Sequence, residues 1–349
     1  MRTRYEEAKS CLRNAPRTWL ITGVAGFIGS NLLETLLKLG QRVVGLDNMS
    51  TGHARNLEDV RLCVGKRDWT RFELIEGDTT SPEDCVAAAR GVDYVLHHAA
   101  LGSVSRSVSD PMGTNRANVD GFLKVLGASK DAGVARFIYA SSSSVYGDHR
   151  ELPKVEGRIG RPLSPYAVSK YANELYAEAF ASAYEMEIIG LRYFNVFGPR
   201  QDPDGPYAAV IPRWLTSLLR GDEIHVHGDG ETSRDFCYVE NAVQANILAA
   251  VAGGAAVNEV YNVACAGRTT LNELFVLLRD LVAEVEPDAA RAEPIYRDFR
   301  AGDVRHSLAD ISKARALLGY EPAHSVRDGL AETMAWYLGG SFGLSLDRG

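Results

Sequence analysis

Short apolar runs alternate with amphipathic helical segments from Thr18 to Arg192. The expected strands are Thr18–Thr22, Arg42–Leu46, Phe72–Glu76, Tyr94–His97, Arg136–Ala140 and Glu187–Arg192. After the first strand, leucines recur with helical spacing at Leu32, Leu33, Leu36, Leu37 and Leu39. Buried-type strands that alternate with helices predict right-handed βαβ units. We therefore expect an α/β fold with a doubly wound parallel sheet (Rossmann), covered by helices on both faces.

Beyond Asn195 the chain becomes rich in Gly, Pro, Asp and Arg, with shorter helices and strands. This composition, with its shorter elements, predicts a smaller, mostly C-terminal α/β substrate domain. A helical segment at Glu240–Ala252 and a strand-like Val260–Val263 suggest that the chain returns to the sheet. The expected units are an N-terminal extension (1–16, with a short helix over 2–14), a dinucleotide-binding domain (17–194 plus about 236–264) and the substrate domain (195–235 plus about 265–349).

A glycine-rich turn, Gly23-x-x-Gly26-x-x-Gly29, lies between the first strand and the first helix. Glycines there allow a tight turn and a close approach of the backbone to a pyrophosphate, which the helix N-terminus attracts. Asp47 ends the second strand, where a carboxylate binds ribose hydroxyls and repels a 2′-phosphate. The pattern therefore predicts an NAD site and disfavours NADP.

The ends of the next two strands add candidate residues. Asp78 and Thr79 follow the third strand, where they could reach the adenine, although a turn or helix cap explains Asp78 equally well. Ala99 and Ala100 follow the fourth strand, where small side chains leave room for a cofactor. We interpret the preceding His97 and His98 as core histidines, because no cysteine or carboxylate partners suggest a metal site.

A run of four serines, Ser141–Ser144, precedes a helix that starts near Pro165, with Ser164 as its N-cap. Tyr166 and Lys170 lie one turn apart on this helix. A phenol is a poor base at neutral pH until a cation stabilises its phenolate. With a serine hydroxyl to share the proton, such a pair could act as general base on an alcohol. The spacing alone is also common on ordinary helix surfaces.

Charge and cysteine content narrow the possible functions. With 38 Lys and Arg against 45 Asp and Glu, the net charge is −7, so we expect no nucleic-acid or membrane partner. The five cysteines are scattered without metal-ligand spacing, which is typical of reduced cysteines in a cytoplasmic protein. The first residues form neither a signal peptide nor an anchor.

Together these residues resemble the extended short-chain dehydrogenase/reductase family, over nearly the whole chain. Within it, the UDP-hexose 4-epimerase group is the most similar, especially bacterial enzymes that act on UDP-N-acetylglucosamine. The matching runs are Leu191–Pro199, Thr232–Phe236 and Arg300–Asp303, in addition to the glycine turn, the serine-rich strand end and Tyr166-x-x-x-Lys170.

The resemblance implies roles for individual residues. Tyr166 would be the base at the sugar 4-hydroxyl, Lys170 would bind the nicotinamide ribose and lower the Tyr166 pKa, and Ser142 would complete the proton relay. The implied NAD-binding residues are Gly23, Gly26, Phe27, Ile28, Gly29, Asp47, Asn48, Asp78, Thr79, Ala99, Ala100, Asn118, Tyr166, Lys170, Tyr193 and Val196. The implied UDP-sugar-binding residues are Ser103, Ser142, Ser143, Ser144, Asn195, Gln201, Ala209, Val210, Arg234, Arg300, Asp303 and Ser307. Arg234 and Arg300 would clamp the diphosphate.

The resemblance also implies a reaction. Related 4,6-dehydratases and decarboxylases carry acidic residues at the positions of Ser143 or Ser144, which argues against both reactions here. What remains is oxidation at C4 and return of the hydride to the opposite face, with NAD regenerated. A UDP-uronic acid 4-epimerase is the main alternative, with Arg268 or Ser103-x-x-Arg106 as carboxylate binder. The second alternative is a non-catalytic regulator that has the same fold and binds NAD.

Two further expectations rest largely on the resemblance. A small residue at Ser307 would admit an N-acetyl group at the sugar C2, whereas a tyrosine there would exclude it; Ser307 could instead merely cap a helix beginning near Ala309. A homodimer would form by packing of the helices at about Met112–Ala132 and Tyr166–Tyr184, with an apolar stripe at Ala172, Leu175, Tyr176, Ala179 and Ala183. Packing within one subunit explains that stripe nearly as well.

Overall fold

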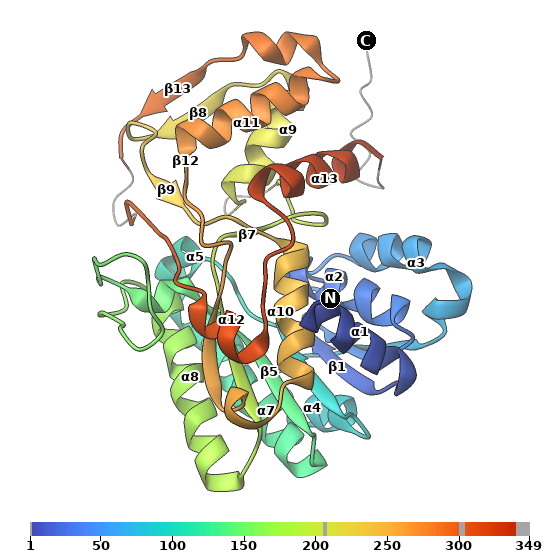
Figure 1. The fold of residues 1–349 in the computed structure, drawn as a ribbon. Helices are drawn as coiled ribbons and strands as arrows, with labels where there is room; N and C mark the ends of the chain where they lie inside the picture. The colour runs from blue at the N-terminus through green and yellow to red at the C-terminus, as the bar shows by residue number, and fades with distance from the viewer. Residues whose placement is uncertain (1, 205–207, 300–303, 340–349) are drawn as a thin grey trace.

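A computed structural model describes residues 2–204, 208–299 and 304–339, and its centre is a seven-stranded sheet (Figure 1). The strands are β1 (Thr18–Thr22), β2 (Arg42–Asp47), β3 (Phe72–Glu76), β4 (Tyr94–His97), β5 (Arg136–Ser142), β6 (Ile188–Tyr193) and β11 (Glu259–Val263). Their order is β11-β6-β5-β4-β1-β2-β3, and all neighbours are parallel. The predicted doubly wound sheet is thus confirmed, and Val260–Val263 does return to it.

The order of the strands reverses beside β1, which pairs with β2 on one side and β4 on the other. The register pairs Thr22 of β1 with Leu46 of β2 and with His97 of β4. On the other half of the sheet, Ser142 of β5 pairs with Tyr193 of β6. The carboxyl ends of these strands therefore meet at one edge, at the point where parallel α/β sheets form a crevice for ligands.

Helices cover both faces of the sheet because successive strand residues point to opposite sides. Trp19 and Ile21 of β1 contribute to a core with α2 (Phe27–Lys38) and α10 (Val239–Val251). Leu20 faces the other side, in a core that includes residues of α4, α7 and α8. The other helices around the sheet are α3 (Ala54–Trp69), α4 (Pro82–Ala89), α5 (Val104–Ser109), α6 (Pro111–Asn115), α7 (Gly121–Ala132), α8 (Pro165–Tyr184) and α12 (Ser312–Leu318).

The N-terminal segment forms α1 (Arg4–Asn14), which packs against α10. Its residues Ala8 and Leu12 are buried in the core beside the sheet. The Gln41 side chain donates to the Leu12 carbonyl oxygen at 2.9 Å, and the Arg4 guanidinium donates to that of Leu317 at 3.2 Å. The extension is therefore an integral part of this face of the protein.

A second group of elements lies above the carboxyl edge of the sheet in Figure 1. It includes α9 (Val210–Arg220), α11 (Leu271–Ala283) and α13 (Val326–Gly339), with the short strands β7 (Val196–Phe197), β8 (Ile224–His227), β9 (Ser233–Arg234), β10 (Cys237–Tyr238), β12 (Thr269–Thr270) and β13 (Pro294–Arg297). These elements have their own apolar core, which contains Trp214, Phe275 and Tyr337.

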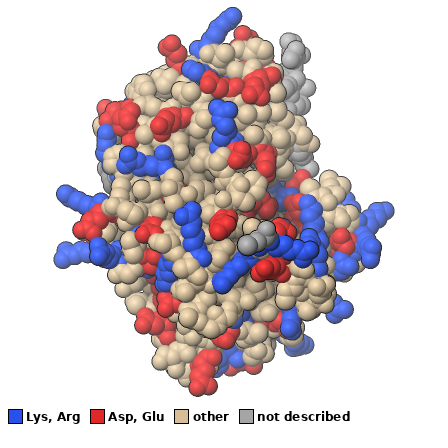
Figure 2. Space-filling model, in the orientation of Figure 1, with Lys and Arg blue, Asp and Glu red and all other residues tan. Residues whose placement is uncertain are grey.

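Charged side chains of both signs are interspersed over the face drawn in Figure 2. Within the described ranges, no helix has the length and hydrophobicity needed to cross a membrane.

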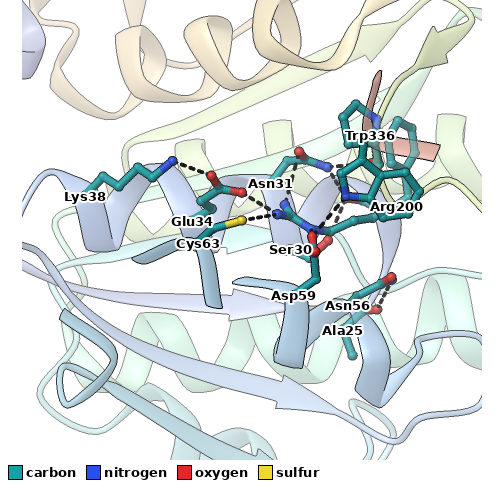
Figure 3. A network of polar contacts seen from close by, with 12 residues as sticks. Ala25, Ser30, Asn31, Glu34, Lys38, Asn56, Asp59, Cys63, Arg200 and Trp336 are labelled. Atoms are coloured by element: carbon teal, nitrogen blue, oxygen red, sulfur yellow. Dashed lines mark hydrogen bonds and ion pairs between the residues drawn. The ribbon is translucent and has the colours of Figure 1, made fainter. Parts of the chain in front are cut away.

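Arg200 joins the second group of elements to the helices of the sheet (Figure 3). Its buried guanidinium donates to Asp59 of α3 at 2.6 Å and to Asn31 of α2 at 3.3 Å, and it also pairs with Glu34. From α13, the Trp336 indole N–H donates to the same Asp59 oxygen at 3.1 Å. One cation therefore holds two acidic side chains and three helices around the loop that follows β7.

We expect Arg200→Met to lower the free energy of unfolding by about 3–5 kcal/mol, because Glu34 and Asp59 would lose the cation that compensates their burial. Chemical denaturation measures this loss. Arg61→Met is the matched control, since Arg61 only forms an ion pair with Glu58 on the surface of α3. Equal, small effects of the two substitutions would contradict a stabilising role for the buried network.

Candidate active site

A cavity of about 670 Å³ lies at the carboxyl edge of the sheet. Its wall contains most of the predicted NAD-binding residues: Gly23, Gly26, Phe27, Ile28, Gly29, Asp47, Asn48, Asp78, Thr79, Ala99, Ala100, Tyr166, Lys170, Tyr193 and Val196. Five of the predicted UDP-sugar-binding residues line the same cavity: Ser142, Ser143, Asn195, Gln201 and Ala209. The structure thus brings residues from distant parts of the sequence to one crevice.

The glycine turn leaves no room for side chains. Gly23 has a positive φ of 71°, and a Cβ there would lie 2.8 Å from the Ala99 nitrogen. A Cβ on Gly29 would lie 2.1 Å from the Gly23 carbonyl oxygen, so helix α2 could not pack against the turn. No side chain caps the N-terminus of α2 at Gly26. Its first N–H groups border the cavity, a cradle that fits the pyrophosphate of NAD.

Asp47 also fits this cofactor. Its two carboxylate oxygens accept from the backbone N–H groups of Ala25 and Met49, at 2.8 and 2.9 Å. These bonds fix the carboxylate in the cavity wall and leave lone pairs for ribose hydroxyls. Next to it, the Asn48 side chain donates to Asp78 at 2.7 Å. Burial alone would raise the pKa of Asp78, but hydrogen bonds from Thr80 and Asn48 outweigh it and lower the pKa.

Ser142, Tyr166 and Lys170 meet between the end of β5 and the first turns of α8. Burial raises the pKa of the Tyr166 phenol, and a hydrogen bond with Ser142 opposes this rise. The Lys170 ammonium donates to the Ala140 carbonyl oxygen at 2.8 Å and lies 5.9 Å from the centre of the Tyr166 ring. Burial lowers the pKa of Lys170 to about 8.

The expected lowering of the Tyr166 pKa by Lys170 is not the dominant effect in the protein without a bound cofactor. The resemblance implies that Lys170 lowers the pKa of Tyr166, yet the phenol pKa is raised, and burial is the largest cause. The ammonium is also engaged with the backbone of β5. Desolvation of the phenol therefore outweighs any favourable effect of the nearby cation.

A buried ion pair holds α8 against the sheet. Arg192 of β6 donates to both carboxylate oxygens of Glu174, at 2.9 and 2.7 Å, and the Ser141 hydroxyl donates to the same carboxylate. Glu174 lies one turn after Lys170. The contact therefore fixes the helix that carries the Tyr–Lys pair relative to the strand end that carries Ser142.

Asn118 lies behind the cavity wall. Its side chain accepts from the Leu101 N–H at 2.7 Å, donates to the Leu101 carbonyl at 3.2 Å and donates to Ser169 of α8 at 3.1 Å. The predicted helix over Met112–Ala132 is interrupted here by a π-helical turn, Arg116–Asp120. Such turns are frequent at functional sites, and this one turns Arg116 and Ala117 to the cavity.

The two histidines have different positions. His97 is buried and bonded to the Thr22 hydroxyl at 2.9 Å, as expected for a core histidine. His98 lines the cavity, where its ring stacks on Tyr193 and contacts the Asn246 amide at 3.2 Å. Burial lowers the pKa of His98 to about 4, so this wall of the cavity is uncharged at neutral pH.

Among the described residues, the other predicted sugar-binding residues do not line the cavity. Ser103 caps α5 through the Arg106 N–H, the hydroxyl oxygen of Ser144 is buried in the turn after β5, and Val210 packs on the second core. Arg234 and Ser307 lie on adjoining segments, since the Ser307 N–H donates to the Ser233 carbonyl at 3.1 Å. The helix after Ser307 begins at Ser312 rather than near Ala309. Arg300 and Asp303 lie outside the described residues.

Several cavity residues were not predicted. Among them are Ser50, Thr51, Gly52, His98, Arg116, Asp202 and Ala208. The run Ser50-Thr51-Gly52 directly follows a strand end, which is a usable sequence signal for a loop at the ligand crevice. Asp202 carries no such signal, because its position depends on contacts with His53 at 2.7 Å and Arg55 at 3.3 Å.

The buried Lys170 provides a test of the site's energetics. The pKa difference between 10.5 and about 8 means that the charged lysine destabilises the folded state by about 3 kcal/mol near pH 7. Lys170→Met should therefore raise the free energy of unfolding by about 1–3 kcal/mol at pH 7, after loss of the bond to Ala140.

The pH dependence has a definite sign. Between about pH 8 and 10.5 the unfolded chain retains the proton that folded Lys170 loses, so the stability of the wild type rises with pH. The advantage of Lys170→Met should shrink over this range. Denaturation curves at several pH values measure it, with the exposed Lys66→Met as control. A destabilised Lys170→Met at pH 7 would contradict the interpretation.

Comparisons with known proteins show the family of the chain. The sequence profile of the NAD dependent epimerase/dehydratase family matches residues 19–264. The UDP-glucose 4-epimerase of Mycolicibacterium smegmatis is 35% identical over 91% of this chain and 97% of that protein. The UDP-glucuronate 4-epimerase of Thermodesulfobacterium geofontis is 32% identical over 91% and 96%.

Among solved structures, the UDP-N-acetylglucosamine 4-epimerase from Methanobrevibacter ruminantium M1, in complex with UDP-N-acetylmuramic acid, is 37% identical. Its TM-score is 0.84, and the alignment covers 93% of this chain and 98% of that one. These similarities extend over both groups of elements, and they confirm the resemblance to the extended short-chain dehydrogenase/reductases. The chain belongs to the NAD dependent epimerase/dehydratase family.

Proposed function

We propose that the chain catalyses the NAD-dependent C4 epimerisation of a UDP-sugar, with UDP-N-acetylhexosamine as the preferred substrate. The observation that carries the proposal is the meeting of Ser142, Tyr166 and Lys170 in the wall of a cavity that also contains a glycine turn and Asp47 suited to a dinucleotide. Neighbouring Ser143 and Ser144 bring no carboxylate to this strand end, which speaks against elimination or decarboxylation. Relatives named for three different UDP-sugars support the reaction but not a choice of sugar.

In this mechanism the protein moves the proton. Tyr166 accepts the proton of the 4-hydroxyl and returns it, with the Ser142 hydroxyl as relay between the phenol and the sugar. The Lys170 ammonium, oriented by the Ala140 carbonyl, favours the phenolate that forms during the transfer. Bound NAD supplies the redox chemistry, in which C4 gives up a hydride and receives it back on the opposite face.

The preference for an N-acetylated sugar rests on Ser307. This serine is half-buried on the segment that pairs with Ser233, next to the predicted diphosphate ligand Arg234. A short side chain at that position leaves space for a substituent at the sugar C2. The same argument makes a bulky side chain there a filter against N-acetyl groups.

The homodimer stays a prediction, and exposed apolar side chains support it. Val104, Val108, Met112, Val168, Leu175 and Tyr176 are exposed on the contacting helices α5, α6 and α8. Leu175 and Tyr176 belong to the stripe expected from the sequence. The cytoplasmic location also stays a prediction.

Incubation of the protein with UDP-N-acetylglucosamine and no added reductant should yield the galacto epimer. UDP-glucose and UDP-glucuronate, assayed in parallel by chromatography or NMR, distinguish the alternatives. Tyr166→Phe should lower the rate by about 10²–10⁴-fold, since it removes the general base. If the folded, NAD-loaded protein converts none of the three sugars, the proposed function is contradicted and the non-catalytic NAD-binding regulator becomes the favoured interpretation.

Ser307→Tyr should depress turnover of UDP-N-acetylglucosamine by about 10-fold or more, while turnover of UDP-glucose changes little, because the larger side chain overlaps only with the C2 substituent. The ratio of kcat/KM values for the two sugars measures this. Ser312→Tyr, at an exposed position on α12, is the control. Equal losses for both sugars would contradict the filter.

A further inference from the structure

Asp235 is a buried carboxylate whose contacts are with backbone rather than with a cation. It lies between β9 and β10 and is 0% exposed. One carboxylate oxygen accepts from the Cys265 N–H at 2.9 Å, and the other accepts from the Ala309 N–H at 3.2 Å. The N–H groups of Ala266 and Gly267 are also close enough to lower the pKa of this carboxyl group. Each of these donors lies on a segment remote from Asp235 in sequence.

The bonds to Asp235 gather three segments. The segment around Ser233 pairs with β12 through Thr270, and its Ser233 hydroxyl contacts the His306 ring at 2.8 Å. The second segment, Cys265–Thr270, carries Arg268. The third segment, Arg305–Ala309, carries Ser307. Arg234 extends from the first segment, immediately before Asp235.

Positive charge gathers where these segments meet. Burial lowers the pKa of His306, and Arg268, Arg305 and Arg234 lower it further. The three guanidinium groups are thus close enough to His306 to disfavour its protonation. Asp229, which accepts from Arg305 at 2.6 Å, acts in the opposite direction. Such a group of cations suits an anionic ligand with several oxygens, such as a diphosphate.

The same residues adjoin the cavity. The Cys237 N–H donates to the Asn195 carbonyl at 3.2 Å, and β10 pairs with β7, which begins at Val196. Asn195 and Val196 both line the cavity, as Tyr166 does, and they closely follow Tyr193, which pairs with Ser142 in the sheet. Asp235 is two residues from Cys237, so it fixes the segments next to the sugar end rather than a distant surface.

Stability does not explain the carboxylate. Burial raises the pKa of Asp235 from 3.8 to about 6, and the backbone hydrogen bonds reverse this only in part. Because the folded-state pKa lies above the unfolded one, ionised Asp235 disfavours the folded state at neutral pH. Ala266, which follows the Cys265 donor, has a positive φ of 56°, which is strained for a residue with a Cβ. The buried charge and the backbone strain both destabilise the fold, so we look for the role of Asp235 in the geometry of the segments that it joins.

We propose that Asp235 is a positioning residue for substrate binding: its carboxylate fixes the segments that carry Arg234, Arg268 and Ser307, and thereby sets the affinity for the nucleoside diphosphate part of the UDP-sugar. The inference rests on the proposed function. Arg268 joins Arg234 and Arg300 as a predicted ligand of the diphosphate. Asp235 itself does not contact the substrate.

Asp235→Asn tests the proposal, because an amide of the same size presents N–H groups to backbone donors. In the NAD-loaded enzyme we expect UDP binding, measured by calorimetry, to weaken roughly 10- to 100-fold, the scale of a misplaced binding group. The KM for the UDP-sugar should rise by a similar factor, with kcat within about 3-fold of wild type and unchanged NAD content. Asp310→Asn, on the same C-terminal segment, should change none of these quantities.

A merely structural role predicts a different pattern. It would lower kcat and NAD content through a smaller folded fraction while leaving KM and the UDP affinity of the folded molecules unchanged, and that result would overturn the proposal. If Asp235→Asn does not fold, Asp235→Ser, which removes the charge and shortens the side chain, should show the same loss of UDP affinity.

UDP binding also separates this inference from the proposed function. A wild-type protein that binds UDP but converts no UDP-sugar refutes the function alone, and the loss of UDP affinity in Asp235→Asn would still support the positioning role. Equal UDP affinity of wild type and Asp235→Asn refutes the positioning role whatever the turnover.

Discussion

The ion pair between Arg192 and Glu174 is the contact on which the geometry of the site depends. It joins β6 to α8 in the interior, with Ser141 of β5 as third member. Each member is close in sequence to a site residue: Arg192 precedes Tyr193, Ser141 precedes Ser142, and Glu174 follows Lys170 by one turn. A bidentate pair has a narrow range of geometries, so it fixes the catalytic helix in one orientation on the sheet.

Buried charge follows a consistent distribution around the cavity. Arg192 and Arg200 each neutralise acidic partners and connect structural elements, whereas Lys170 and Asp235 contact mainly backbone groups. The ion pairs of Arg192 and Arg200 hold the helices and strands around the cavity together. The backbone contacts of Lys170 and Asp235 leave a charge whose burial disfavours folding, which is the expected pattern where chemistry or binding needs a charge in a fixed place. The apolar cores on both faces of the sheet supply the stability that offsets this cost.

The sequence was most informative where local rules act. Hydrophobic runs predicted all seven strands of the sheet. The glycine spacing and strand ends, together with the family resemblance, predicted many of the residues that line the cavity. The sequence was least informative where position depends on contacts between remote segments. Asp202 reaches the cavity through His53, and the π-helical turn at Arg116 interrupts an otherwise regular helical pattern. The raised pKa of Tyr166 could not be predicted either, because the spacing of Tyr166 and Lys170 in the sequence does not show how deeply the phenol is buried.

In the proposed function, the architecture separates the reaction from the choice of sugar. Ser142, Tyr166 and Lys170 are held by the sheet and by α8, whose positions are fixed by hydrogen bonds over several residues and by buried ion pairs. The segments that carry Arg234, Arg268 and Ser307 contain only short strands and depend on single contacts such as those of Asp235 and Ser233. Substitutions in these segments can alter the binding pocket without disturbing the proton relay. Relatives of similar identity that act on different UDP-sugars are what such a division of labour would produce.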